Sequence, residues 1–260
     1  MPARKRKKKT LKLKVSPWTA VAAASLLLAA VFLLFRRGWG PAGEVGAKVP
    51  SGTWRYGIDI SHNNAGPIVW DSLFVMTDQR GRTVRDPFKA KDIKPVSFVF
   101  IKATEGATHR DPDFSDNWKE AGKAGLRRGA YHFFRSSKDG EVQARNFIRT
   151  VGDLRFRDLP PVLDIETMHP GCTRQLLNKR AMQWLETVEK HYGKKPIVYA
   201  SSSFITDNLS EDISGNYPIW VAHYSKDRPS RERWTWWQVT DRAVVMGVPG
   251  RVDLSVTKAD

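Results

Sequence analysis

Residues 97–106 read SFVFIKATEG, and the run Phe98–Ile101 within this stretch is apolar at every position. A strand that is apolar on both faces is typical of a parallel sheet covered by helices, because both faces are then buried. The stretch ends in Lys102, Thr104 and Glu105, so polar groups stand where the strand ends. It therefore predicts a buried parallel strand that carries chemistry at its carboxyl end.

Similar apolar runs alternate with helical patterns along the rest of the chain after residue 54. Besides 97–102, strands are predicted at Tyr56–Ile60, Gly129–Phe134, Pro161–Ile165, Pro196–Ala200, Pro218–Ala222 and Trp234–Val239. Helices are predicted at Phe114–Ala124, Gly140–Val151 and Arg174–Tyr192. This alternation predicts the α/β class, with a parallel sheet built as a barrel or as an open sheet.

Carboxylates stand at or near the ends of several of these runs. Asp59, Glu105, Asp164 and Glu166 follow apolar strand residues, and Asp253 follows a valine near the end of the chain. In a parallel barrel the carboxyl ends of all strands face one rim, and active sites are built there. We therefore expect these side chains to meet at one rim.

The pair Asp164 and Glu166 has the spacing that glycosidase chemistry uses. Residues i and i+2 of a strand point to the same face, with roughly 6.5–7 Å between their Cα atoms. Two carboxylates so placed repel, so one keeps its proton while the other stays charged. A glycosidase needs this division between a proton donor and an anion. The spacing alone also fits a magnesium or calcium ligand pair, or a solvated strand end.

Several linked motifs resemble the glycoside hydrolase family 25 lysozymes in order and approximate spacing. They are GIDISH at 57–62, FVFIKATEG at 98–106, GAYHFF at 129–134, LDIE at 163–166, PIWVA at 218–222 and WQ at 237–238. The resemblance covers about residues 54–257. It implies a shortened TIM-like (β/α)5β3 barrel with its site at the carboxyl rim. It also implies an N-acetylmuramidase that cuts the β-1,4 bond from N-acetylmuramic acid to N-acetylglucosamine in peptidoglycan.

The resemblance also implies roles for four carboxylates. Glu166 is expected to be the general acid, and Asp164 to orient or polarise the 2-acetamido group of the sugar. Asp59 and Asp253 are expected to complete a ring of carboxylates. If the acetamido oxygen itself attacks the anomeric carbon, no enzyme nucleophile is needed, as in other substrate-assisted glycosidases. No cofactor is expected. Glu105 is expected to bind substrate, with a structural role as the alternative.

Further residues near the predicted strand ends are candidates for binding sugar. The apolar face of a pyranose packs on aromatic rings, although aromatic residues at these positions also suit a barrel core. The candidates are Tyr131, His132, Trp220, Tyr224, Trp237 and Gln238. No metal site is expected, because His62, His132 and His223 lack ligand spacing. Cys172, the single cysteine, has no paired histidine pattern that would indicate a nucleophile.

One segment departs from the family pattern. Residues 72–95 are longer than the short helix that usually leads to the next strand, and they include the polar, basic stretch 77–85. We interpret this insertion as a loop or hairpin near the rim of the groove, where basic side chains would contact the anionic peptide stems of peptidoglycan. A solvated insertion with no role is the alternative.

The N-terminal segment predicts a membrane anchor. The whole chain has a net charge of +16, and residues 1–40 contain ten Lys and Arg but no acid. Residues 1–15 are read as a basic cytoplasmic tail, 16–37 as a transmembrane helix and 38–53 as a flexible Gly/Pro linker before the barrel at 54–260. The uncharged run Trp18–Phe35 would span roughly 27 Å as a helix. A cleaved signal peptide and a buried core helix are the alternatives.

Together these features predict a single-pass, N-in membrane protein whose catalytic domain lies outside the cytoplasmic membrane, in the periplasm if the host has an outer membrane. Its expected partners are peptidoglycan glycan strands and the lipid bilayer. A wall-binding protein without activity is a second possibility. A third is a nucleic-acid or anionic-membrane binder that uses the lysine tail. We expect no nucleic acid, because the tail serves as a topology signal and no basic stripe with aromatics follows residue 40. Nothing in the sequence indicates an oligomeric state.

Overall fold

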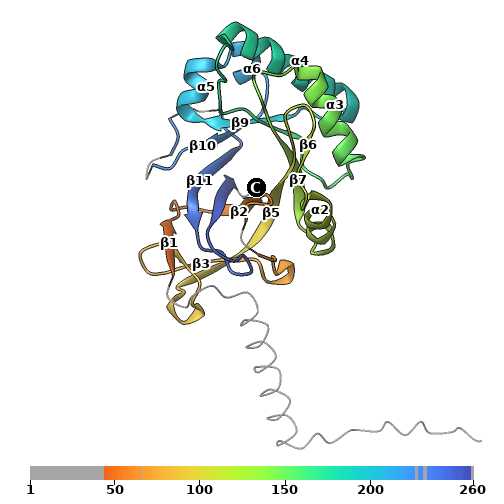
Figure 1. The fold of residues 1–260 in the computed structure, drawn as a ribbon. Helices are drawn as coiled ribbons and strands as arrows, with labels where there is room; N and C mark the ends of the chain where they lie inside the picture. The colour runs from red at the N-terminus through yellow and green to blue at the C-terminus, as the bar shows by residue number, and fades with distance from the viewer. Residues whose placement is uncertain (1–43, 65, 226–227, 231–232, 259–260) are drawn as a thin grey trace, which may run out of the picture. The chain divides into compact units, whose positions relative to one another are not determined.

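The computed structural model describes residues 44–64, 66–225, 228–230 and 233–258. Eight strands close into a barrel in the order β2, β5, β7, β8, β9, β10, β11 and β12, and β12 pairs back with β2 (Figure 1). Their bounds are β2 Trp54–Ile60, β5 Asp92–Glu105, β7 Arg127–Phe133, β8 Val162–Asp164, β9 Ile197–Ser201, β10 Ile219–Ala222, β11 Trp236–Ala243 and β12 Val252–Lys258. The first seven run parallel, and β12 is antiparallel to both neighbours. The predicted α/β barrel is confirmed.

Helices cover the outside of the parallel half of the barrel (Figure 1). Their bounds are α2 Phe114–Lys123, α3 Gly140–Val151, α4 Arg174–Tyr192, α5 Ser202–Asn208 and α6 Glu211–Ser214. The sequence predicted the three longer helices, whereas α5 and α6 are too short to show a period. Helix α4 begins where the Thr173 side chain accepts a hydrogen bond from Leu176 N, and it ends at Gly193, whose φ of 62° suits glycine.

Strand β5 shows why its sequence is apolar on both faces. Phe98 and Phe100 belong to the cluster inside the barrel, whereas Val99 and Ile101 belong to the cluster between the strands and the outer layer. Glycine on the adjacent β2 makes room for the inner rings, because a Cβ at Gly57 would lie 2.1 Å from the Phe98 ring. The lower part of the barrel is therefore filled with packed side chains.

The insertion 72–95 forms a hairpin, which is one of the two forms expected for it. Strands β3 (Phe74–Thr77) and β4 (Arg82–Val84) pair with each other, and β3 pairs with the first residues of β5. Short 3-10 helices flank the hairpin at Trp70–Ser72 and Pro87–Lys89. A further short strand, β6 (His109–Arg110), pairs with the end of β5.

The linker prediction for 38–53 is wrong in its second half. Val45–Lys48 form strand β1, which pairs with β4 and extends the small sheet of the hairpin. Val49, directly after β1, and Val75 of β3 belong to the same buried cluster as Tyr56 and Ile58 of β2. Strand pairing and this apolar contact order the segment despite its glycines.

Arg85 ties the hairpin to the connection between β11 and β12. Its guanidinium is 1% exposed and donates to the carbonyls of Val248 and Gly250 at 2.7 Å each. Thr83 Oγ1 accepts a hydrogen bond from Val244 N at 2.9 Å in the same region. Arg85 is therefore held inside the domain and does not reach toward the substrate. For the other basic residues of the insertion, contact with the peptide stems stays a prediction.

We expect Arg85→Ala to destabilise the domain by about 3 kcal/mol, because two buried carbonyls lose charged hydrogen-bond donors. The exposed Arg80 lies on the same hairpin, and Arg80→Ala should cost no more than about 0.5 kcal/mol. Urea unfolding followed by tryptophan fluorescence compares the two variants. Equal stabilities would show that the Arg85 contacts contribute nothing.

The predicted transmembrane helix at 16–37 lies outside the described residues. Within the ranges that the structure does describe, no helix has the length and the apolar character needed to cross a bilayer.

Candidate active site

A pocket of about 200 Å³ opens at the carboxyl ends of the barrel strands. Four carboxylates line it: Asp59 on β2, Asp164 at the end of β8, Glu166 two residues later and Asp253 on β12. Asp59 and Asp253 are direct partners across the antiparallel β2–β12 pair. The structure thus brings together four of the five carboxylates that the sequence singled out, all except Glu105, although they are up to 194 positions apart in the sequence.

Two of these carboxylates are almost inaccessible to solvent. Asp59 is 9% exposed and Asp164 is 7% exposed. Among the described residues, neither Asp59 Oδ1 nor Asp164 Oδ1 has a hydrogen-bond partner. A buried acceptor without a partner is costly unless a ligand or a proton satisfies it. Both atoms belong to side chains that line the pocket, so they are available to a polar group of a bound substrate.

Gln238 is the centre of a hydrogen-bond network that fixes Asp59. Its Nε2 donates to Asp59 Oδ2 at 2.9 Å and lies 3.4 Å from Asp253 Oδ2. Its Oε1 accepts from the hydroxyl groups of Tyr199 at 2.8 Å and Tyr224 at 2.6 Å. Because its side chain is buried and fully engaged, Gln238 orients the acidic residues and does not itself face the substrate.

Burial raises the pKa of both Asp59 and Asp253, the former well above its ordinary value. The negative charge of Asp253 raises the pKa of Asp59 further. A hydrogen bond between the two carboxyls favours the proton on Asp59, since it raises the pKa of Asp59 and lowers that of Asp253. Of the two carboxyls, Asp59 is therefore the one whose protonated form is favoured more strongly.

Burial is also the main cause of the raised pKa values of Asp164 and Glu166. The charge of Glu166 raises the pKa of Asp164 further, while Lys102 acts in the opposite direction. The charge of Asp253 adds to the effect of burial on Glu166. The pKa of each of the four carboxyls is thus raised, which favours its protonated form relative to an ordinary carboxyl.

One cation, Lys102, lines the same pocket and is held by an ion-pair chain. Its Nζ donates to Glu105 Oε2 at 2.7 Å, and Arg135 donates to Glu105 Oε1. Burial alone would raise the pKa of Glu105, but the hydrogen bonds and charges of Lys102 and Arg135 lower it to about 2. Both of its oxygens are engaged, and it does not line the pocket. The structure thus favours the structural alternative for Glu105 over substrate binding.

Aromatic residues form the floor and wall of the pocket. Tyr131, Tyr199 and Trp220 line it, and the Trp220 ring stacks on Phe100 with centroids 4.4 Å apart. Trp220 is 2% exposed and its Nε1 donates to Ser255 Oγ at 3.0 Å. It is therefore both barrel core and pocket floor. Tyr131 is more accessible and remains a candidate platform for a sugar ring.

Two further predicted substrate contacts, besides Glu105 and Gln238, do not line the pocket. His132 is fully buried on the helix side of β7, where its ring stacks against Trp184 and its nitrogens lie 2.7 Å from Thr104 Oγ1 and 3.1 Å from Gln143 Oε1. Trp237 is 1% exposed and packs against Trp54 on the outside of the barrel. The alternation of a strand turns both side chains away from the pocket, whereas Tyr131 and Gln238 point inward.

Tyr224 occupies an intermediate position. It is 53% exposed, and its hydroxyl group reaches Gln238. It does not line the acidic pocket, but its ring is accessible beside it and stays a predicted sugar contact.

Other candidate chemistry is explained by local contacts. His62 Nδ1 lies 2.6 Å from Asp111 Oδ2, and Cys172 Sγ lies 3.4 Å from the Ser136 carbonyl. Among the residues that the structure describes, no three His, Cys, Asp or Glu side chains are grouped to hold a metal ion.

The sequence reasoning missed several pocket residues. Tyr199 and Lys102 line the pocket, as do Ser61, Asn63 and Phe133. Lys102 and Tyr199 lie within strands that were predicted, two residues or fewer from the carboxyl end of the predicted run. Asking which residues at the strand ends face inward, whether or not they are carboxylates, would have found them.

The sequence of this chain is similar to those of known proteins. The family model described as "Glycosyl hydrolases family 25" matches residues 58–248. The protein YegX of Escherichia coli (strain K12) is 39% identical over 221 residues, which are 84% of this chain and 75% of YegX. Lysozyme M1 of Streptomyces globisporus is 32% identical over 76% of this chain and 65% of its own length.

The fold is also similar to those of solved structures of bacterial lysozymes and glycosyl hydrolases. A bacterial lysozyme from Streptomyces coelicolor superposes with a TM-score of 0.67 at 28% identity, covering 81% of this chain and 94% of its own. A family 25 glycosyl hydrolase from Bacillus anthracis superposes with a TM-score of 0.65 at 31% identity, covering 85% of this chain and 96% of its own. Both relatives therefore consist almost entirely of the region that matches.

Proposed function

The chain belongs to glycosyl hydrolase family 25, and from this premise we propose that it cleaves the β-1,4 bond between N-acetylmuramic acid and N-acetylglucosamine. It is a glycosidase of the lysozyme type, and its substrate is peptidoglycan. The observation that carries the proposal is the pocket in which Asp59, Asp164, Glu166 and Asp253 converge at the carboxyl ends of the strands. In a barrel of parallel strands, this end is the one that performs chemistry.

Glu166 is the general acid in this proposal. Burial and the charge of Asp253 raise its pKa, so it keeps its proton in the range where ordinary carboxyls lose theirs. It lies two residues beyond Asp164 and is the more exposed of the two, as a donor to the glycosidic oxygen must be. Glu166 gives its proton to the leaving oxygen as the bond to the anomeric carbon breaks.

Asp164 assists the 2-acetamido group of the sugar. Its carboxylate accepts the acetamido N–H, turns the acetamido oxygen toward the anomeric carbon and stabilises the positive charge that grows on the amide as this oxygen attacks. The pKa of the free Asp164 is raised, but a neighbouring cationic amide reverses that preference and favours its anion. Water then opens the cyclic intermediate, with Glu166 as the base. Two displacements at one carbon retain its configuration.

Asp59 and Asp253 complete the acidic ring, and Gln238 fixes their positions. In the proposal they bind sugar hydroxyl groups, while the charge of Asp253 keeps Glu166 protonated. Tyr131 and Tyr224 offer ring faces to the sugar.

The role of Asp253 predicts a shift in the pH profile. Glu166 must be protonated to act, so activity falls as the pH rises through its pKa. Because the Asp253 charge raises that pKa, Asp253→Asn should move the alkaline limb of kcat/KM to lower pH. The limb is measured on soluble glycan chains across the pH range, with Asp116→Asn, at an exposed position of α2, as the control. An unmoved limb in Asp253→Asn contradicts the assignment.

We further propose that residues 16–37 anchor the protein in the cytoplasmic membrane with the N-terminus inside, so that the barrel acts on the wall from the periplasm or the outer surface. The support is the uncharged run Trp18–Phe35, preceded by a basic tail. Fractionation of cells in which the chain carries a C-terminal tag, followed by protease treatment of spheroplasts, tests this arrangement. Protection of the tag from protease contradicts it.

The proposed activity is tested with the purified full chain in detergent and isolated sacculi. Release of soluble muropeptides with time supports a hydrolase. A wall-binding protein without activity is the second candidate, because the aromatic floor and the acidic ring also suit simple sugar binding. Co-sedimentation with intact sacculi and no release of muropeptides would favour that candidate and contradict the hydrolase.

A further inference from the structure

The end of the barrel opposite the acidic pocket carries a cluster of cations. A hollow there is lined by Arg55, Arg127, Arg157 and Lys258, and none of its lining residues is acidic. Arg55 and Arg127 lie at the beginnings of β2 and β7. Arg157 lies in the loop after α3, and Lys258 is the last residue of β12. Since parallel strands begin at the end opposite to their carboxyl rim, this hollow faces away from the catalytic pocket.

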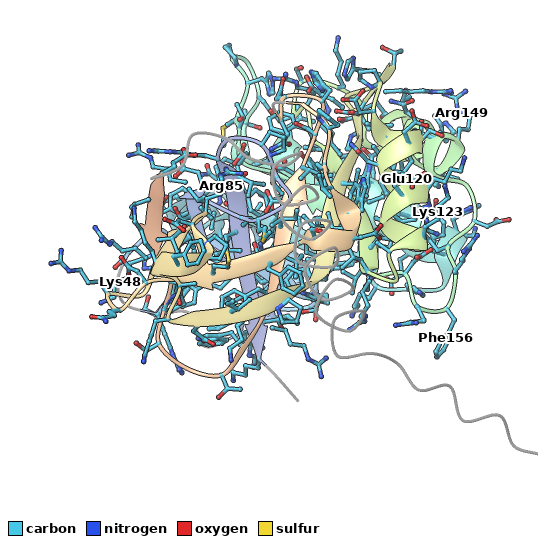
Figure 2. All side chains as sticks on the ribbon, turned by 90° about the horizontal axis from the view of Figure 1, so that it is seen from below. Lys48, Arg85, Glu120, Lys123, Arg149 and Phe156 are labelled. Carbon is cyan, nitrogen blue, oxygen red and sulfur yellow. The ribbon has the colours of Figure 1, made fainter. Side chains whose placement is uncertain are left out.

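The loop between α3 and β8 presents an aromatic ring among these cations. Phe156 is 98% exposed and stands between Arg155 and Arg157. Figure 2 shows its ring projecting from the barrel, on the side far from Lys48. An isolated apolar ring held almost entirely in solvent has no structural role in the monomer.

Hydrogen bonds and an ion pair of Asp158 fix the backbone of this loop. Asp158 Oδ2 accepts from Arg155 N at 2.8 Å, and Asp158 forms a buried ion pair with Arg128 at 2.8 Å. Lys194 Nζ donates to the Asp158 carbonyl at 2.9 Å. The exposure of Phe156 is therefore imposed by a fixed backbone.

The local charge balance is strongly positive. A neighbouring hollow contains Lys119, Lys123 and Arg155 against one acid, Asp153. Lys123 is paired with Glu120 at 2.8 Å. Within the described ranges, Arg127, Arg155 and Arg157 form no ion pair with a carboxylate, so their charges are available to a partner.

We propose that this surface, the basal basic face (Arg55, Arg127, Arg155, Phe156, Arg157 and Lys258), docks on a bilayer rich in anionic phospholipid. Each Lys or Arg near such a surface is attracted to it, and an aromatic ring settles at the level of the headgroups. A single-stranded nucleic acid instead needs successive exposed rings that stack its bases along a groove. Phe156 is the one exposed ring of this face, because Phe98 in the hollow is buried and Trp236 is only partly accessible. Charge complementarity with lipid phosphates therefore favours the membrane.

Docking in this way turns the acidic pocket away from the bilayer and toward the glycan strands. This orientation goes beyond the proposed anchor, which fixes the protein to the membrane but not the direction of its barrel. The cations come from four separate segments, so no basic stripe marks them in the sequence.

The test uses the fragment 38–260, which lacks the predicted anchor. The Streptomyces coelicolor relative, 94% of whose chain is matched, shows that such a barrel folds on its own. Binding to vesicles of phosphatidylglycerol and phosphatidylcholine is compared with binding to pure phosphatidylcholine vesicles by co-sedimentation. The variants are Arg155→Gln/Arg157→Gln and Phe156→Ser. The charge-matched control is Lys48→Gln/Lys179→Gln, at two exposed positions outside this face.

We expect binding to the anionic vesicles at least tenfold tighter than to the neutral ones. The affinity of the double arginine variant for anionic vesicles should be about 25-fold lower, because each lost cation lowers it about fivefold. Phe156→Ser should lower this affinity several-fold without changing the net charge, and the control should lower it less than twofold. All variants should hydrolyse soluble glycan at the parent rate, which separates this test from the proposed function. Equal losses in the control and the arginine variant, or binding to RNA without binding to anionic vesicles, would overturn the proposal.

Discussion

Glu166→Gln is expected to lower the rate of peptidoglycan hydrolysis by about a thousandfold, within the range that general acid catalysis contributes. The amide has nearly the shape of the acid but has no proton to give to the leaving oxygen. Glu166 lines the pocket without filling it, so the substitution leaves the cavity and its other carboxyls in place. Affinity for glycan strands should therefore be retained while kcat falls.

The comparison needs both rate and binding. Release of muropeptides from sacculi gives the rate, and isothermal titration with a soluble glycan oligomer gives the affinity. Glu186→Gln, the same chemical change on the exposed face of α4, serves as the control and should behave like the parent. Near-normal turnover of Glu166→Gln would remove this residue as the acid.

Loss of the acetyl group from the substrate is expected to slow cleavage by at least about a hundredfold, because the proposed nucleophile is the acetamido oxygen. Asp164→Asn should have an effect of similar size on acetylated glycan, since a neutral amide cannot stabilise the positive charge on the acetamido group. The two changes remove the same interaction, so their effects should not add.

This prediction takes the form of a cycle. Parent and Asp164→Asn proteins are assayed on fully acetylated and on de-N-acetylated glycan chains. We expect Asp164→Asn to lower the rate of cleavage about a hundredfold on acetylated glycan and less than about fivefold on de-N-acetylated glycan. Additive losses, or rapid cleavage of de-N-acetylated glycan by the parent, would contradict attack by the acetamido group.

The sequence predicted the barrel well because its strands are buried on both faces. The run Phe98–Ile101 has no polar position, and only a covered parallel strand explains it. Helix α4 was predicted with the bounds that the structure gives, because its apolar positions repeat over 19 residues between a threonine cap and a glycine stop. Long elements with a period carry this information themselves.

Elements that depend on distant partners were missed. Strand β1 is rich in glycine and alanine, and it is a strand only because β4 pairs with it. The hairpin β3–β4 was expected only as one of two possible forms; it is polar at its turn, whereas Val75, Met76, Thr83 and Val84 are buried by tertiary contacts. Such segments acquire their structure from tertiary contacts, which no local pattern contains.

At the site, residue types were predicted better than side-chain directions. The four catalytic candidates Asp59, Asp164, Glu166 and Asp253 converge as expected. His132 lies next to the pocket residue Tyr131, and Trp237 lies next to Gln238, yet both side chains are buried away from the pocket. A shift of one position on a strand reverses the face, so nearness to a strand end does not determine whether a side chain contacts the substrate.

The most direct test of the central claim identifies the bond that is cut. The full chain is incubated with purified peptidoglycan, the products are reduced with borohydride, and their new ends are read by mass spectrometry. Cleavage as proposed yields muramitol at every new reducing end in the parent, and almost none in Glu166→Gln. Glucosaminitol ends would contradict the claim, because they would show that the neighbouring glycosidic bond is the one hydrolysed.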